Sequence, residues 1–118
     1  MRVSTMLAAA GLLLGTAAQA QNAPIGNAEH GKQVYMQQLC YTCHGTAGQG
    51  GDRGAGPRIA PNPFPWVAFE QQVRKPRQVM VPYSEKNLPS QDLADIYAYL
   101  VSIKVGPAAK DVPLLNNF

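Results

Sequence analysis

Cys40-Tyr41-Thr42-Cys43-His44 combines two thiols and an imidazole at a fixed spacing. Thiols three positions apart can add across the two vinyl groups of a haem and leave thioether bonds. The histidine that follows the second cysteine then stands beneath the ring, where one of its nitrogens can bind the iron. We therefore expect Cys40 and Cys43 to attach one covalent haem c, with His44 as an axial ligand of its iron.

Two other kinds of site could use these cysteines. A redox-active dithiol is typical of a thioredoxin-like βαβ fold, and the sequence has no alternating strand pattern. A closed zinc site needs a fourth ligand beside Cys40, Cys43 and His44. His30 is the other histidine, and there is no second Cys-x-x-Cys. The pattern favours haem attachment over both alternatives.

Two methionines outside the N-terminal segment could complete the coordination of the iron. Met36 precedes the cysteine pair by about one helical turn, on the attachment side, and we expect it to fill the core. Met80 lies in an irregular stretch between Pro76 and Pro82, where backbone can be laid against a flat ring. We expect Met80 to be the second axial ligand, with His30 as the alternative.

Residues 1–20 have the pattern of a cleaved export signal. A positive start at Arg2 and an apolar run are followed by Ala18-Gln19-Ala20, which fits the small-x-small pattern that signal peptidase cuts. The apolar run is too short for a bilayer, which needs roughly 20 residues. An uncleaved anchor or a buried helix is the alternative. We expect export to the periplasm.

The chain has 118 residues, enough for one domain, which we expect at 27–106. A flexible leader at 21–26 precedes it and a C-terminal tail at 107–118 follows. A domain of this size has a marginal core, and a disulfide between cysteines so close together would close almost no loop. A large covalent cofactor would supply the missing apolar core.

Hydrophobic periodicity predicts an all-α fold with three main helices. They are expected at about 27–39, 63–74 and 90–104. Asn27, Asn62 and Ser90 are the predicted N-caps. Long loops at 45–65 and 77–89 separate the helices, and loops of this length are unusual unless they wrap something.

These motifs resemble a class I cytochrome c of the small bacterial kind, over almost all of residues 27–105. The matching segments are Gly31 with Tyr35, Cys40 to Gly45, Gly56-Pro57, Met80 to Tyr83 and Leu93 to Leu100. The resemblance implies a cytochrome c fold, with three main helices and long loops around one haem held by histidine and methionine. It also implies that the Pro57 carbonyl accepts a hydrogen bond from the other ring nitrogen of His44.

The resemblance further implies that the first and last helices cross near Gly31, Tyr35 and Tyr97. There are two departures from the family pattern. Tyr35 stands five residues before Cys40, where four is usual, so we expect a small helix irregularity. Val81 stands where a proline is commoner, and we expect no consequence.

Several side chains are candidates either for the haem pocket or for ordinary core: Ile59, Trp66, Phe69, Tyr83 and Tyr97. Trp66 or Arg58 could also bind a haem propionate. Arg74, Lys75 and Arg77 form a basic run ahead of the second methionine. This run is either a solvated patch or a rim that docks acidic partners, and it is too small to indicate nucleic acid binding.

Two filled axial positions leave no open site for a substrate, so we expect an electron carrier and not an enzyme. The expected donor is a periplasmic dehydrogenase or membrane respiratory complex, and the expected acceptor is a terminal oxidase or reductase. The alternative is a fixed electron-transfer subunit of a heteromeric periplasmic oxidoreductase, which the tail at 107–118 would suit. A third reading is an enzyme or gas sensor in which Met80 dissociates.

Overall fold

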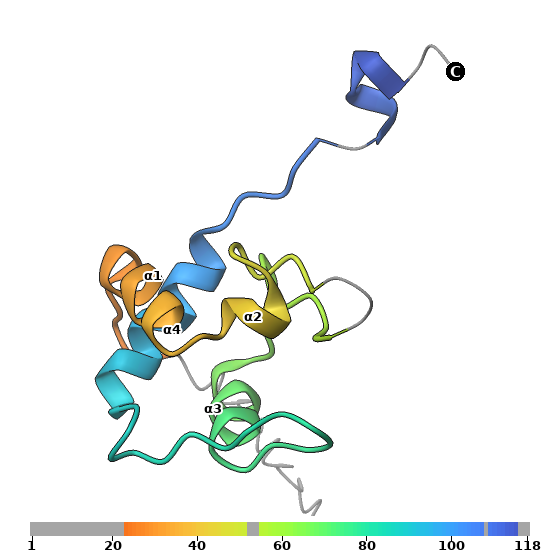
Figure 1. The fold of residues 1–118 in the computed structure, drawn as a ribbon. Coiled ribbons are helices and arrows are strands. Elements are labelled where there is room, and N and C mark those ends of the chain that lie inside the picture. Colours follow the sequence, from red (N-terminus) through yellow and green to blue (C-terminus); the bar gives the residue numbers. More distant parts are fainter. Residues whose placement is uncertain (1–22, 52–54, 108, 116–118) are drawn as a thin grey trace, which may run out of the picture.

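The computed structural model describes residues 23–51, 55–107 and 109–115 (Figure 1). These residues form the helices α1 (Ala28–Gln37), α2 (Tyr41–His44), α3 (Trp66–Arg74) and α4 (Ser90–Ser102), and the short 3-10 helices η2 (Ala109–Asp111) and η3 (Pro113–Leu115). The expected all-α fold is confirmed. The expected export signal lies outside the described residues. In the described ranges, no helix is long and apolar enough to cross a membrane.

Helices α1 and α4 pack against each other and form the centre of the fold (Figure 1). Gly31 marks their closest approach, because a Cβ at this position would contact the backbone carbonyl of Asp95 and lie 2.8 Å from the Ile96 nitrogen. Next to the crossing, Tyr35 and Tyr99 pack with their ring centroids 5.5 Å apart. A side chain any larger than hydrogen at position 31 would therefore force the two helices apart.

The aromatic partner of Tyr35 is Tyr99, which corrects the expectation that Tyr97 would lie at this crossing. Tyr97 instead packs against α3, with ring centroids 5.5 Å from Trp66 and 5.1 Å from Phe69. Positions 97 and 99 are about 200° apart around a helix, so they serve opposite sides of α4. Tyr99 joins α4 to α1, and Tyr97 joins α4 to α3.

Helix α1 begins at the predicted cap and ends two residues earlier than expected. The Asn27 side chain accepts hydrogen bonds from the backbone nitrogens of Glu29 and His30, which confirms it as the N-cap. Leu39 has a φ of 60°, which an α-helix cannot contain, so the helix stops before it. The nitrogen of Cys40 then bonds to the carbonyl of residue 35 at 3.1 Å. The expected irregularity before the cysteine is confirmed.

The other two main helices begin and end differently from the prediction. Helix α3 starts at Trp66 and not near Pro63, and its flanking residue is Pro65, so Asn62 is not its cap. Residues that precede a proline are disfavoured in helical geometry, which excludes an earlier start. Helix α4 includes Ser90 as its first residue and ends at Ser102, so Lys104 lies beyond it.

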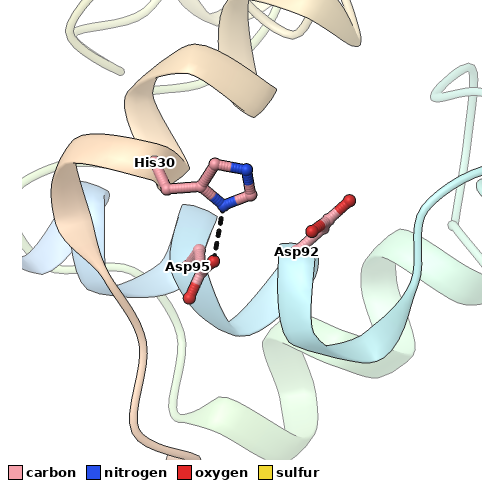
Figure 2. A group of neighbouring side chains, drawn as sticks. All are labelled: His30, Asp92 and Asp95. Atoms are coloured by element: carbon pink, nitrogen blue, oxygen red, sulfur yellow. Dashed lines mark hydrogen bonds and ion pairs between the residues drawn. The ribbon is translucent and has the colours of Figure 1, made fainter.

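A hydrogen-bonded pair, His30 and Asp95, joins α1 to α4 where the two helices cross (Figure 2). Nδ1 of His30 donates to Oδ2 of Asp95 at 2.7 Å, while Oδ1 accepts from the Asn27 nitrogen at 2.7 Å and from Gln91 at 3.0 Å. Burial tends to raise the pKa of Asp95, but these hydrogen bonds lower it below the ordinary value of 3.8. His30, the alternative iron ligand of the sequence analysis, is thus an exposed residue of the first helical turn whose ring pairs with a buried carboxylate.

Candidate functional site

The two cysteines and the histidine lie on the short helix α2 and the residue that precedes it. Cys40 is half-buried, Cys43 is exposed, and both thiols are free. Burial raises the pKa of Cys40 to about 11, so its sulfur is a protonated thiol at neutral pH. Two free thiols on adjacent helical turns can react with the two vinyl groups of one haem. Neither cysteine is in a disulfide, so both are available for that reaction.

The imidazole of His44 is held in one orientation by the backbone. Its Nδ1 lies 2.9 Å from the carbonyl oxygen of Pro57, the contact that the family resemblance implied. Because a carbonyl oxygen only accepts hydrogen bonds, Nδ1 carries a proton, so in the neutral imidazole Nε2 has the lone pair that can bind a metal. Such a bond to the outer nitrogen is the usual way in which a metal-binding histidine is oriented.

The loop that carries Pro57 can come close to His44 because residue 56 is a glycine. A Cβ on Gly56 would lie 2.6 Å from the carbonyl oxygen of Cys43 and 3.1 Å from Nδ1 of His44. A further tie comes from Tyr35, whose hydroxyl donates to the Gly45 carbonyl at 2.7 Å. The segment after the histidine is therefore fixed both to the loop and to α1.

An apolar pocket opens beside Cys40 and His44, between α3 and α4. The other lining residues are Tyr35, Ile59, Phe69, Val73, Tyr83, Leu88, Leu93, Ile96 and Leu100. An apolar wall with one imidazole and one thiol suits a flat, largely apolar ring that is bound through sulfur and nitrogen. The residues present therefore fit a covalently attached haem.

The predicted pocket residues divide into two groups. Ile59 and Tyr83 line the pocket, and so does Phe69. Trp66 and Tyr97 are instead packed against each other, edge to face, in the aromatic cluster between α3 and α4. They contribute to the core next to the pocket and not to its wall.

Met80 lies in the loop that follows α3, where its half-buried side chain packs against the core. Its sulfur lies 3.9 Å from Nε2 of Gln72. The same loop is anchored by Tyr83, whose nitrogen bonds to the Val73 carbonyl at 3.0 Å and whose hydroxyl donates to the Gln38 carbonyl at 2.9 Å. The loop is thus fixed to α3 on one side and to the end of α1 on the other.

The three residues of the basic run differ in their exposure. Arg74 is half-buried, and its guanidinium donates to the carbonyls of Leu88 at 2.6 Å and Tyr83 at 3.2 Å. Arg74 therefore holds the loop through these carbonyls, and its part in a docking rim stays a prediction. Lys75 and Arg77 are exposed.

Three side chains of types that bind metals lie close together, one on α1 and two on α4. Ligand atoms of His30, Asp92 and Asp95 lie within 4.8 Å of one another. In Figure 2 the dashed contact joins His30 to Asp95, and Asp92 stands to one side. Both oxygens of Asp95 already accept hydrogen bonds from the chain. This cluster is thus a structural contact between helices.

Most of the pocket wall carries no sequence signal that identifies it as a site. Leu93, Ile96 and Leu100 lie in the segment that matches the family pattern, but none of them is predicted to line a site. Their spacing of three and four residues marks one face of a helix without telling which partner covers that face. Gln72 gave no signal, because a single glutamine on a helix is most often a solvated residue.

The comparisons with known proteins agree with this geometry. A family model described as "Cytochrome C oxidase, cbb3-type, subunit III" matches residues 26–100. Cytochrome c-555 from Methylococcus capsulatus (strain ATCC 33009 / NCIMB 11132 / Bath) is 35% identical over 98 residues, which cover 79% of this chain and 77% of that protein. No solved structure matches. The chain therefore belongs to the c-type cytochromes, small electron-transfer proteins with covalently bound haem c.

Proposed function

We propose that this cytochrome is a periplasmic carrier of single electrons, and that His44 and Met80 are the two axial ligands of its haem iron. The observation that carries the proposal is the fixed imidazole of His44 beside the apolar pocket, with Nε2 free to bind a metal. The haem supplies a one-electron couple between ferric and ferrous iron. Cys40 and Cys43 hold the ring, and the apolar wall limits solvent rearrangement when its charge changes.

The position of Met80 supports its role as the second ligand. It is half-buried on a loop that is tied to both α1 and α3, so its sulfur is held near the core and not in solvent. Met36, the other methionine in the described part of the chain, packs against the core from α1. Two filled axial positions favour electron transfer over chemistry on a bound substrate.

The ligand assignment is tested by replacing each methionine with alanine. We expect Met80→Ala to lose the weak far-red band that arises from sulfur-to-iron charge transfer, while the covalent haem is retained. Met36→Ala is the matched control and should keep the band. If the band survives in Met80→Ala, methionine 80 is not the ligand. Carbon monoxide binding by the reduced, unmutated protein at neutral pH would favour a gas sensor instead.

A second candidate function is that of a fixed subunit in a larger oxidoreductase. The family description names an oxidase subunit, and the chain after α4 runs away from the helical body, towards η2 and η3 (Figure 1). Purification from the native periplasm at physiological salt separates the two functions. A lone monomer supports the free carrier, and co-elution with an enzyme supports the subunit.

The proposed docking region for acidic partners is the exposed part of the Met80 loop. Lys75 and Arg77 are exposed there, next to the apolar side chains of Val79 and Val81, which are 92% and 61% exposed. Charges at a rim mainly accelerate association, and salt weakens this effect. We expect the rate of electron exchange with a periplasmic dehydrogenase, a membrane complex or a terminal oxidase to fall as salt rises.

A further inference from the structure

The side-chain amide of Gln72 connects α3 to the loop that carries Met80. Its Nε2 lies 3.9 Å from the sulfur of Met80, and its Oε1 lies 3.4 Å from the backbone nitrogen of Arg77. Gln72 is half-buried, whereas its neighbour Gln71 is exposed. One amide therefore contacts two points of the same loop.

These two contacts fix the direction in which the amide points. A backbone nitrogen only donates, so the group that faces Arg77 must be the amide oxygen. A thioether sulfur only accepts, so the group that faces Met80 must be the amide nitrogen. Turning the amide over would place two donors together at one end and two acceptors at the other. The N–H of Gln72 is thus held towards the sulfur.

We infer that Gln72 is a positioning residue that donates a hydrogen bond to the sulfur of Met80 and thereby raises the reduction potential of the haem. The inference rests on the proposed ligation by Met80. A thioether has a second lone pair that can accept a hydrogen bond while the first binds iron. An N–H at the sulfur withdraws electron density that would otherwise stabilise ferric iron, so the donor favours the reduced state. Hydrogen bonds from neighbouring residues to the groups that bind the iron tune haem iron in this way.

The test compares Gln72→Leu with Gln71→Leu on the intact holoprotein, by potentiometric titration at neutral pH. Leucine removes the donor without adding charge. We expect Gln72→Leu to lower the equilibrium constant for reduction about three- to tenfold, which is about 28–59 mV at 59 mV per tenfold change. Gln71→Leu should leave the potential unchanged. Equal potentials in the two variants would overturn the inference.

A second variant separates tuning of the sulfur from simple anchoring of the loop. Gln72→Glu keeps the oxygen that accepts from Arg77 but loses the N–H that faces the sulfur, and Gln71→Glu adds the same charge one residue away. If Gln72 acts by donation, the potential falls further in Gln72→Glu than in Gln71→Glu. If the two glutamates lower it equally, Gln72 only anchors the loop and the inference fails.

The far-red band distinguishes failure of this inference from failure of the ligand assignment. We expect the band to persist in Gln72→Leu, which shows that the potential changed while the sulfur stayed on the iron. If Met80→Ala loses the band but Gln72→Leu has the parent potential, only the inference about Gln72 is overturned. If Met80→Ala keeps the band, the ligand assignment itself is wrong and the inference falls with it.

Discussion

Replacing Gly31 with alanine puts one methyl group into the crossing of α1 and α4. The new Cβ would contact the backbone carbonyl of Asp95, at a separation below the 3.0 Å that Cβ atoms essentially never pass. Because that contact is backbone on a packed helix, the helices must move apart, and the packing of Tyr35 on Tyr99 loosens with them. Overpacking of this kind costs about 3 kcal/mol at the upper end of its usual range.

Helix propensity acts in the opposite direction, since alanine is favoured over glycine inside a helix by about 1 kcal/mol. We therefore expect Gly31→Ala to lower the free energy of unfolding by about 2 kcal/mol. For a domain of this size that is a fall in Tm of roughly 8–16 °C. Helix propensity alone would predict a higher free energy of unfolding, so the sign of the measured change shows whether overpacking or propensity dominates.

The measurement is denaturant and thermal unfolding of the ferric holoprotein, followed by far-ultraviolet circular dichroism. Gly106→Ala is the control, because a Cβ at this exposed position meets nothing within 4 Å. That variant should stay within about 0.5 kcal/mol of the parent. A Gly31→Ala protein as stable as the parent would show that the helices do not cross as closely as described.

Two further predictions concern buried charges. Because the pKa of Asp95 lies below its ordinary value of 3.8, its stabilisation is present above that value and is lost as pH falls through the lower pKa of the folded state. Asp95→Asn should lower the free energy of unfolding by about 1–3 kcal/mol at pH 7. When the unfolding free energies of the parent and the variant are measured at falling pH, the difference between them should narrow below about pH 4. A difference that stays constant would exclude the carboxylate as its cause. Arg74→Met should lower the unfolding free energy by about 1.5–3 kcal/mol, since the carbonyl of Leu88 loses a charged donor at 2.6 Å. The neighbouring Lys75→Met should change it by less than about 0.5 kcal/mol in the same denaturation assay, and equal effects would show that Arg74 has no structural role.

The attachment motif and the existence of the three main helices could be predicted from sequence because both are local. Cys40, Cys43 and His44 are neighbours along the chain, so their spacing alone indicates the chemistry. The stripe that contains Leu93, Ile96 and Leu100 repeats within one helix and is visible without knowing its partners. The irregularity before Cys40 could be expected from the family resemblance, because Tyr35 stands five residues before Cys40 where the family pattern has four.

The features that were missed depend on contacts between distant parts of the chain. His30 and Asp95 are separated by 65 residues, and nothing in the local sequence around either marks the other as its partner. Tyr97 and Tyr99 differ only in the direction in which each projects from α4, and that direction has meaning only once α1 and α3 are placed. Arg74 belongs to a basic run in the sequence, and the run does not reveal the carbonyls that it binds, which come later in the chain.

The loop after α3 is held by short hydrogen bonds at its ends and by the two longer contacts of Gln72, at 3.4 and 3.9 Å, in its middle. Arg74 and Tyr83 bind it to the helices, whereas Val79 is 92% exposed between them. Its middle can therefore open in a local fluctuation that leaves α1 and α4 packed, at a fraction of the free energy of global unfolding. Amide protons around Val79 should exchange with solvent through such openings, well ahead of those in α4. That order of exchange would mean that the loop opens at a lower free energy than the helical body.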